Sequence, residues 1–512
     1  MPNEFFCVFL HFIYIYAMNT KIMNNKVIVL LAVLMLGFAA AAQGSFTLTT
    51  GAESRNMDAE MLSEAKYLGQ YEGLHCWAGG KEGEQKVVML TDHNMMPMSS
   101  MVLPESSEGC KIMTATMDDG KACLTLVDSS YAKMTFIYSS VIELATMRPA
   151  DSTAPMVLVD SLGYGRNDHC YAWGAVSPNG RLAAIIYIVE YTDRQQYSAR
   201  AILYDAQLRE QWRKDYALGS MENLVVTDDG TMVTTGFEEG GDETHFIYNI
   251  LERNRAETFD AVVQCPHVRQ LKLAGVAGSK VIGVGTFSPA EGRYQEMLCE
   301  GVLTMAFDIN SASLTGFNMR TFQNEDLNIL LNAKTRRVQK YQDIDLVSVS
   351  GYTITDWGAV VAVGRNWHLN RTEDNGTTSL LYHRMGLHLV AIDTTGRVRW
   401  VRNLRRNDVQ RNDNYLLGLQ MTSHEGVTYI VKNEPRRTPP IYEIGREAKL
   451  LAMGDRSVLA LYTISADGEV EKHILSAKTP YSLLQAIQRP DGHLLLGAAG
   501  KKVKLGEVKC ER

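Results

Sequence analysis

The feature that most constrains this chain is a short glycine turn followed by an apolar run, which recurs along the sequence. Examples are DDGKACLTLV at Gly120, PNGRLAAIIYIV at Gly180, DDGTMVTTGF at Gly230, HEGVTYIVKN at Gly426 and PDGHLLLGAAG at Gly492. Glycine after a polar residue supplies the positive φ that a hairpin turn needs. The Val and Ile that follow favour a strand buried on both faces. The pattern predicts a succession of β-hairpins.

The spacing of these turns, 37 to 80 residues, predicts one repeated unit. A four-stranded unit cannot bury both of its faces alone, and closing such units into a ring is the β-propeller solution. We therefore predict an all-β fold, a single β-propeller of about seven four-stranded antiparallel blades within a range of six to eight. Helices are expected only in short turns such as 57–69. The alternative is a pair of β-sandwich domains joined near residue 320.

A second type of hairpin joins an acidic residue to a tryptophan seven residues later. It occurs in AILYDAQLREQW, from Asp205 to Trp212, and in LVAIDTTGRVRW, from Asp393 to Trp400. In the second copy Gly396 provides the turn. We interpret both copies as outer hairpins of propeller blades, in which the tryptophan packs against a neighbouring blade.

The order of Ala391, Asp393, Gly396 and Trp400 resembles the A-x-D-x-x-x-G-x-x-x-W blades of quinoprotein dehydrogenases and of non-enzymatic assembly-factor propellers. The turn here is one residue shorter, and the shorter form looks like the hairpin of many exported bacterial propellers. The resemblance implies that the tryptophan packs between blades, that the acid and glycine shape the turn, and that none of them contacts a substrate. A quinoprotein also needs a calcium site and residues that stack on its cofactor. The sequence shows neither, so no cofactor is expected.

The amino-terminal region has the layout of a secretory signal peptide. Lys26 precedes an apolar run, Val27 to Ala42, which ends in small residues. A membrane-spanning helix needs about 20 apolar residues, so this run is short for that role. We expect cleavage after Ala42, no membrane span afterwards, and a periplasmic, cell-surface or secreted protein. The expected divisions are an upstream extension plus cleaved signal peptide (1–42), an amino-terminal lead-in (43–80) and the propeller (81–512).

Cysteine spacing suggests disulfides if the chain is exported, because disulfides persist in oxidising compartments. The candidate pairs are Cys110 with Cys123, Cys265 with Cys299, and Cys76 with Cys510. Spacing alone leaves all three pairs open.

The net charge of −7 and the pI near 6.0 argue against a nucleic-acid binder, which usually carries a basic field. No zinc spacing of Cys and His occurs. Segment 92–101 places one His and four Met together, which would suit copper(I). The chain has 24 Met, however, and Met commonly fills cores. The carboxylates of 237–245 lack the spacing of a known calcium loop. Because none of the zinc, copper and calcium patterns is convincing, we predict no metal site.

The best polar cluster in front of a strand is Tyr164, Arg166, Asp168 and His169. The strands that begin at such points line the central channel of a propeller, where ligands usually bind. We predict that these four residues contribute to a binding site.

A second candidate is the long segment 364–386 between two strands, which carries Trp367, His368 and Tyr382. Long loops on a rigid scaffold are where binding residues concentrate. No G-x-S-x-G, H-E-x-x-H or phosphate-binding motif occurs, and no catalytic residue is assigned. The sequence favours a non-catalytic binding or assembly module for an unknown protein or glycan. The alternative is a hydrolase or lyase acting on glycans or peptides in the channel, so enzymatic activity stays open.

Overall fold

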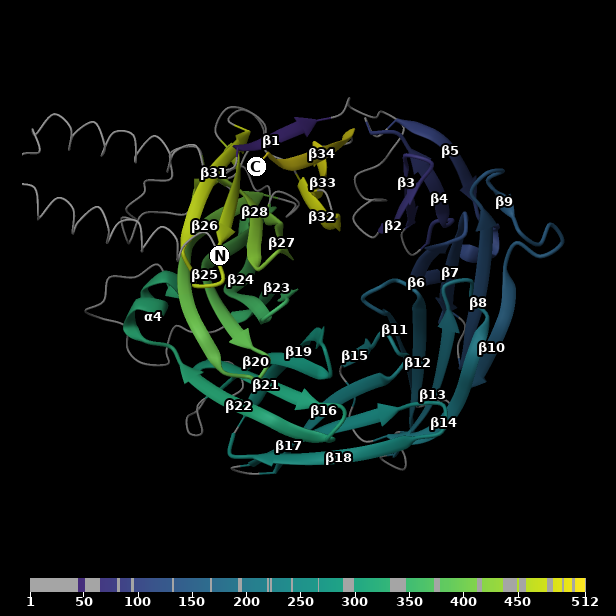
Figure 1. Cartoon of the computed structure of the whole chain (residues 1–512), viewed down its shortest axis with the longest axis horizontal. Helices are drawn as coiled ribbons and strands as arrows, with labels where there is room; N and C mark the ends of the chain where they lie inside the picture. Colours follow the sequence, from purple (N-terminus) through teal and green to yellow (C-terminus); the bar gives the residue numbers. More distant parts are fainter. Residues whose placement is uncertain are drawn as a thin grey trace, which may run out of the picture. The chain divides into compact units, whose positions relative to one another are not determined.

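The computed structural model describes residues 45–50 and 65–511, with internal gaps. The gaps are 81–82, 94–95, 131–132, 166–167, 192–195, 219–220, 222, 241–242, 266, 289–298, 332–346, 373–377, 412–416, 436–448, 451–456, 477–481, 490–491 and 500–501. The chain divides into two compact units, residues 1–47 with 508–512, and residues 48–507. The second unit holds the propeller (Figure 1).

Seven sheets are each built from strands that are neighbours in the sequence. Blade 1, in the order β2-β3-β4-β5, consists of Lys66–Tyr71, Leu74–Gly79, Val87–Thr91 and Pro97–Val102. Blade 2, in the order β6-β7-β8-β10, consists of Cys110–Asp118, Lys121–Asp128, Met134–Glu143 and Val157–Gly163, and the short β9 (Arg148–Pro149) pairs with β8. Blade 3, in the order β11-β12-β13-β14, consists of His169–Val176, Leu182–Tyr191, Gln196–Asp205 and Glu210–Leu218.

Blades 4 to 7 continue the same pattern. Blade 4 consists of β15 to β18, Asn223–Val226, Met232–Gly240, Glu243–Leu251 and Ala256–Val263. Blade 5 consists of β19 to β22, Val268–Ala277, Lys280–Phe287, Gly301–Asp308 and Ser313–Thr321. Blade 6 consists of β23 to β26, Val347–Thr355, Gly358–Thr372, Thr378–Asp393 and Val398–Arg411, with β29 (Lys449–Leu450) added in parallel to β26. Blade 7 consists of β27, β28, β30 and β31, Leu419–His424, Val427–Pro435, Ser457–Ile464 and Val470–Ser476.

An eighth sheet combines strands from the two ends of the chain. Its order is β1-β34-β33-β32, that is Ser45–Thr50, Lys502–Glu511, Gly492–Ala499 and Ser482–Arg489. The prediction of an all-β propeller with about seven four-stranded antiparallel blades is confirmed. Blade 1 begins at Lys66, inside the expected lead-in 43–80. Residues 66–69 are strand, so a helix over all of 57–69 is wrong.

Within the described residues there is one α-helix, α4 (Asn324–Leu331), between blades 5 and 6, and one 3-10 turn, η1 (Glu105–Ser107). No helix in this part of the chain is both long and apolar enough to cross a membrane.

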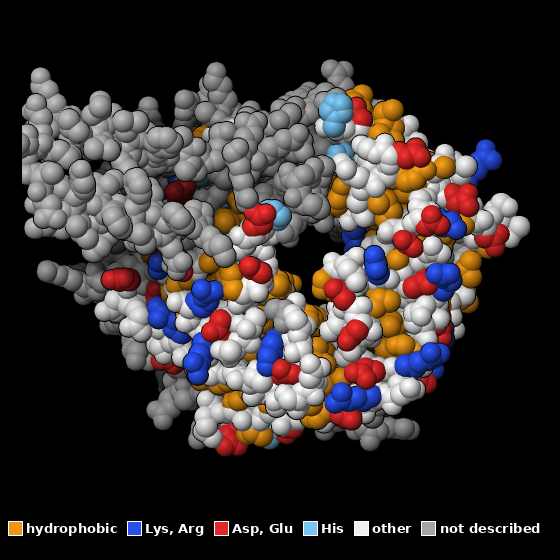
Figure 2. All heavy atoms as spheres, in the orientation of Figure 1, with side chains coloured by type: hydrophobic (Ala, Val, Ile, Leu, Met, Phe, Trp, Pro, Cys, Tyr) orange, Lys and Arg blue, Asp and Glu red, His pale blue; other side chains and the backbone are white. Residues whose placement is uncertain are grey.

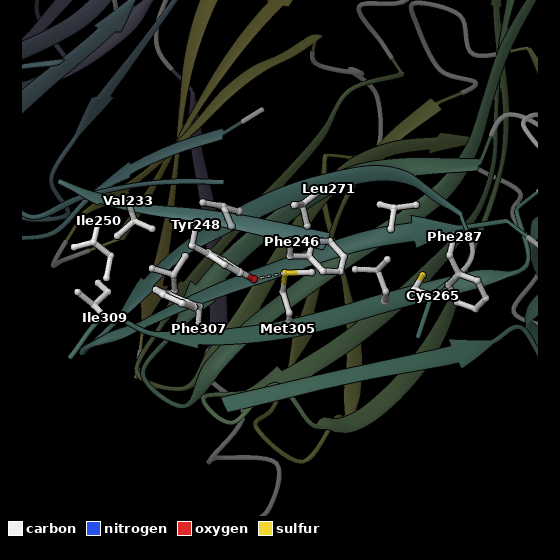
Figure 3. Packing of buried hydrophobic residues seen from close by; sticks show 14 residues of the cluster. Val233, Phe246, Tyr248, Ile250, Cys265, Leu271, Phe287, Met305, Phe307 and Ile309 are labelled. Carbon is white, nitrogen blue, oxygen red and sulfur yellow. Dashed lines mark hydrogen bonds between the residues drawn. The ribbon is translucent and has the colours of Figure 1, made fainter. Parts of the chain in front are cut away.

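The core consists of apolar layers between consecutive blades. Blades 4 and 5 show the arrangement in Figure 3, where Phe246 and Tyr248 of β17 meet Met305 and Phe307 of β21. The Tyr248 and Phe307 rings stack with centroids 4.1 Å apart, and the Tyr248 hydroxyl lies 2.9 Å from the Met305 sulfur. Similar clusters join each pair of neighbours from blades 1 and 2 to blades 6 and 7. Each of blades 2 to 6 thus has both of its faces covered by its two neighbours, as a repeated β-unit requires.

The two ends of the blades differ in their connections. We call the end where the inner strands begin the loop rim, and the end where they finish the turn rim. At the turn rim all but one connection spans two to five residues, and the exception is 144–156. The two longest stretches between consecutive strands of the blades, 322–346 and 436–456, separate strand ends at the loop rim, and most of their residues lie outside the described part of the chain.

Candidate functional site

The inner strands β6, β11, β15, β19, β23 and β27 contact one another in succession and surround the central channel (Figure 1). Figure 2 shows an opening at the centre of one face, with acidic, basic and apolar side chains around its described part. Each inner strand is the last strand of its sheet, so one of its backbone edges has no strand partner in the described structure. Side chains of neighbouring inner strands already bond part of this edge: Asn223 bonds the backbone of Leu271 and Leu273, and Gln270 accepts a hydrogen bond from the Val349 N–H. The remaining backbone groups of the edge are open to a ligand.

Three of the four residues predicted from the first cluster lie in a tight turn in front of β11 or at the start of this strand. The Asp168 carboxylate accepts a hydrogen bond from the Gly165 backbone N–H (2.8 Å), and the Tyr164 N–H donates to the Lys133 carbonyl (3.0 Å). His169 is the exposed first residue of β11. Arg166 lies outside the described residues. Asp168 therefore shapes the turn, and His169 stands at the loop-rim end of the channel wall.

A row of aromatic rings continues from His169 along β11. The centroids of His169 and Tyr171 are 6.3 Å apart, and those of Tyr171 and Trp173 are 6.0 Å apart. Trp173 packs on the core between blades 3 and 4, whereas Tyr171 is 46% exposed. The sequence interpretation stopped at His169 and missed Tyr171. The aromatic residue at every second position of HCYAWG was the pattern that would have found it.

Segment 364–386 is mostly strand, contrary to the long loop that was expected. β24 and β25 extend as a hairpin, and their cross-strand pairs include Trp367 with His383 and His368 with Tyr382. The Trp367 and His383 rings stack at 4.7 Å, and the Arg365 guanidinium lies 4.8 Å from the Trp367 ring. Regular pairing satisfies the backbone in a way that an irregular loop would not.

The hairpin divides its predicted residues between two faces, because side chains alternate along a strand. Trp367 lies on one face, and His368 with Tyr382, 6.0 Å apart, lies on the other. The two predicted groups belong to blades 3 and 6, and both are at the loop rim.

The hairpin from Asp393 to Trp400 joins three blades. Gly396 makes the turn with a φ of +79°, and its carbonyl accepts hydrogen bonds from Thr304 (2.8 Å) and Asn318 (2.7 Å) of blade 5. Trp400 is 8% exposed, packs in the core between blades 6 and 7, and donates from Nε1 to the carbonyl of Ala466 (3.0 Å). These contacts give the motif a role in blade packing, away from the channel.

The copy from Asp205 to Trp212 forms the corresponding turn in blade 3 and likewise contacts the neighbouring blades. The Asp205 carboxylate accepts hydrogen bonds from the backbone of Gln207 (2.9 Å) and Arg209 (3.0 Å) and so closes the turn. The Thr116 hydroxyl of blade 2 donates to the carbonyl of Ala206 (2.9 Å). Trp212 packs on the core between blades 3 and 4.

The predicted disulfides are absent from the described cysteines, and geometry explains why. In the blade 2 hairpin Cys110 pairs with Asp128 and Cys123 with Thr116, which separates the two cysteines by five residues, or about 17 Å, along β7. Cys265 lies in the core between blades 4 and 5, and Cys299 in the core between blades 5 and 6.

Cys76 is also a thiol, so the pair with Cys510 is wrong. The side chain of Cys510 lies outside the described residues. Burial raises the pKa of Cys76, Cys110, Cys123 and Cys299 to about 12. These buried thiols are therefore protonated at neutral pH and poor nucleophiles.

A buried carboxylate at the start of α4 fixes this helix to blade 6. Asp326 accepts hydrogen bonds from Asn403 (2.8 Å), Arg320 (3.0 Å) and the Gln323 backbone (2.9 Å), and the His388 ring nitrogen Nδ1 is 3.3 Å away. Burial raises the pKa of Asp326, but these partners, led by His388, outweigh it and hold the pKa well below its usual range. Asp326 therefore has a structural role, because its carboxylate oxygens are already bonded by groups of the protein itself.

A second buried charge cluster lies in blade 7. The Glu434 carboxylate is 3.0 Å from the Lys432 ammonium group, accepts a hydrogen bond from the Tyr462 hydroxyl (2.7 Å), and pairs with Lys472. Burial raises the pKa of Glu434, but the two lysines more than offset this, and the pKa is lowered. The cluster links β28, β30 and β31, and we assign it to stability.

No group of three or more His, Cys, Asp or Glu in the described part of the chain could hold a metal ion. The charged side chains that sequence reasoning missed are Lys66, Lys111, Arg269 and Lys272, which lie on inner strands. Each looks like an ordinary strand residue until the fold shows which strands line the channel.

No family model matches the chain, and no curated protein matches it. Among solved structures it is similar to the WD40 domain of SCAP from fission yeast, with 8% identity over 91% of this chain and 95% of that chain and a TM-score of 0.39. It is also similar to the β-propeller domain of the Trilobed protease from Pyrococcus furiosus, with 10% identity over 79% of this chain and 96% of that chain and a TM-score of 0.33. A europium-containing methanol dehydrogenase shares 8% identity over 88% of both chains at a TM-score of 0.34. Likeness at this distance carries no inference about function.

Proposed function

We propose that this chain is an exported, non-catalytic binding module that takes its ligand at the loop rim and the adjoining part of the channel. The observation that carries the proposal is the unequal distribution of connections. Apart from 144–156, connections of two to five residues close one rim, whereas the extended β24–β25 hairpin and the two longest stretches between strands, 322–346 and 436–456, belong to the other. A rigid scaffold with variable connections at one end is the usual arrangement of a binding surface.

An exposed aromatic side chain on an inner strand supports the same location. Tyr171, the third residue of β11, is 46% exposed, although its strand lies at the centre of the fold. Tyrosine offers a large apolar surface with one polar end and is enriched at binding interfaces. The exposure of Tyr171 is consistent with a ligand that covers it.

The charges on the inner strands favour binding over the alternative hydrolase or lyase. General acid–base catalysis needs converging titratable groups. Among inner strands with described side chains, Asp118 is the one acidic residue, and it ends β6 at the turn rim. Its carboxylate accepts a hydrogen bond from Gln207 (3.0 Å) and so takes part in blade packing.

The test is site-specific photo-crosslinking in the native host. A benzophenone amino acid replaces Tyr171 in one variant and Val262 in a control, because Val262 is 50% exposed on β18, the outermost strand of blade 4. We expect a discrete adduct from position 171 and none from position 262. Equal adducts at both positions, or an adduct at position 262 alone, would exclude a ligand site at the loop rim.

A further inference from the structure

The inner strands carry a charge that differs from that of the whole chain. The chain has a net charge of −7. The seven inner strands of blades 1 to 7, in contrast, hold four Lys or Arg and one Asp. The four cations are Lys66, Lys111, Arg269 and Lys272. The channel wall is therefore positive within an acidic protein, and a low-dielectric wall strengthens such a field.

The cations lie near one end of the channel and on separate parts of its wall. Lys66 begins β2, Lys111 is the second residue of β6, and Arg269 and Lys272 lie in the first half of β19. All four thus belong to the loop-rim half, whereas Asp118 ends β6 at the turn rim. Blades 1 and 2 hold one pair of cations and blade 5 holds the other, so a ligand in the channel meets positive charge from more than one direction.

These cations have no acidic partner among the described residues. Lys111 and Lys272 are exposed, and the Lys66 ammonium group donates to the carbonyl of Met113 (2.8 Å). Burial, and then the charge of Lys111, lower the pKa of Lys66. One guanidinium nitrogen of Arg269, Nη1, is buried without a hydrogen-bond partner in the described structure.

The backbone of the wall favours a polypeptide ligand over other polyanions. Each inner strand has one edge without a strand partner, and an extended peptide can bond those N–H and C=O groups of the edge that Asn223 and Gln270 do not already occupy. Tyr171 adds exposed apolar contact surface in the loop-rim half of β11. Cations, unpaired strand edges and an exposed tyrosine together match an extended segment rich in Asp and Glu.

We propose that the loop-rim half of the channel binds an extended acidic peptide segment of a partner protein, held by Lys66, Lys111, Arg269 and Lys272. This proposal rests on the proposed function, because it names the ligand class of the same site.

The experiment measures binding of a fluorescently labelled glutamate homopeptide to the full-length protein by fluorescence anisotropy. Lys111→Gln and Lys272→Gln are the test variants, because both side chains are exposed and their replacement should leave the fold intact. Lys214→Gln on β14, the outermost strand of blade 3, is the matched control. We expect each test variant to weaken binding by about two- to five-fold, corresponding to about 0.4 to 1 kcal/mol for one partly solvated charge pair, and the control to leave binding unchanged.

Salt and competing ligands complete the test. Raising the ionic strength from about 0.01 M to about 1 M shortens the Debye length from about 30 Å to about 3 Å, so binding should weaken over this range. A glutamine homopeptide and a lysine homopeptide should not bind. Binding of an oligosaccharide of uronic acids in place of the glutamate peptide would overturn the assignment to a peptide, and equal affinity in Lys111→Gln, Lys272→Gln and Lys214→Gln would overturn the role of the channel.

The outcome is separable from that of the proposed function. An adduct at position 171 without binding of the glutamate peptide rejects the acidic ligand and keeps the loop-rim site. Failure of the adduct rejects the loop-rim site itself.

Discussion

Trp400 provides the most direct test of how the blades hold together. The side chain is 8% exposed and lies between blades 6 and 7. A buried tryptophan removes about 200 Å² from water, and at about 25 cal/mol per Å² its loss in Trp400→Ala should lower the free energy of unfolding by about 5 kcal/mol. This value agrees with the roughly 3–5 kcal/mol typical of Trp→Ala in protein cores.

Trp400→Phe separates packing from hydrogen bonding. Phenylalanine keeps most of the apolar surface and loses the bond from Nε1 to the Ala466 carbonyl, so the expected loss is about 1–2 kcal/mol. Trp367→Ala is the control, because it makes the same substitution at a tryptophan that is only half-buried in the β24–β25 hairpin. It should lower the free energy of unfolding by less than Trp400→Ala does. Urea unfolding followed by tryptophan fluorescence and circular dichroism measures all three variants.

Gly468 allows the contact to be tested from the other side. It has a φ of +82°, and a Cβ there would lie 2.9 Å from atoms of the Trp400 ring. Gly468→Ala should therefore cost about 1–2 kcal/mol from the backbone and a further amount from the ring contact. With Trp400→Ala already present, only the backbone cost should remain, and the double-mutant cycle should show about 1 kcal/mol or more of coupling. Strict additivity, or a loss below about 1 kcal/mol in Trp400→Ala, would refute the placement of this side chain.

Three further predictions concern other parts of the chain. Gly316→Ala places a Cβ 1.7 Å from the Thr395 carbonyl oxygen and should destabilise the fold by roughly 3 kcal/mol in urea unfolding, whereas the exposed Ser313→Ala should have little effect; equal losses would contradict the close contact between blades 5 and 6. The folded-state pKa of Asp326 is lowered, so its stabilisation is complete above the unfolded pKa of about 3.9 and is lost as the pH falls. The difference in unfolding free energy between the natural protein and Asp326→Asn should accordingly shrink between about pH 6 and about pH 3, and a constant difference would argue against this structural role. Mass spectrometry of the exported protein should find Gln43 at its amino terminus, and retention of residues 1–42 would contradict the signal-peptide prediction.

The repeated glycine turns carried most of the predictable information about the fold. Gly120, Gly180, Gly230 and Gly426 all adopt positive φ in turns between the first two strands of a blade. Local turn chemistry is readable in the sequence because φ above zero strongly restricts the residue type. The expected propeller followed from the repetition of these turns.

Other features depended on tertiary structure. Segment 364–386 looked like a loop because its polar and aromatic residues lack clear apolar alternation, yet cross-strand pairing made it a hairpin. Cysteine spacing could not show that Cys110 and Cys123 lie five residues apart along the paired strands. The channel cations could not be identified before the inner strands were known.

The outer hairpins explain why the turn rim is poorly suited to a variable ligand site. Side chains of one blade donate to turn carbonyls of the next at several places, which include Thr116 to Ala206, Thr304 to Gly396, and Trp400 to Ala466. The conformation of each of these turns is therefore constrained by its short loop and by a hydrogen-bond donor from the preceding blade. A change in such a turn would also disturb the packing between the two blades. The stretches between strands at the loop rim differ more in length, and the inner-strand cations lie at that end. The turns of the turn rim thus take part in the contacts between blades, which leaves the loop rim as the end where binding specificity can vary.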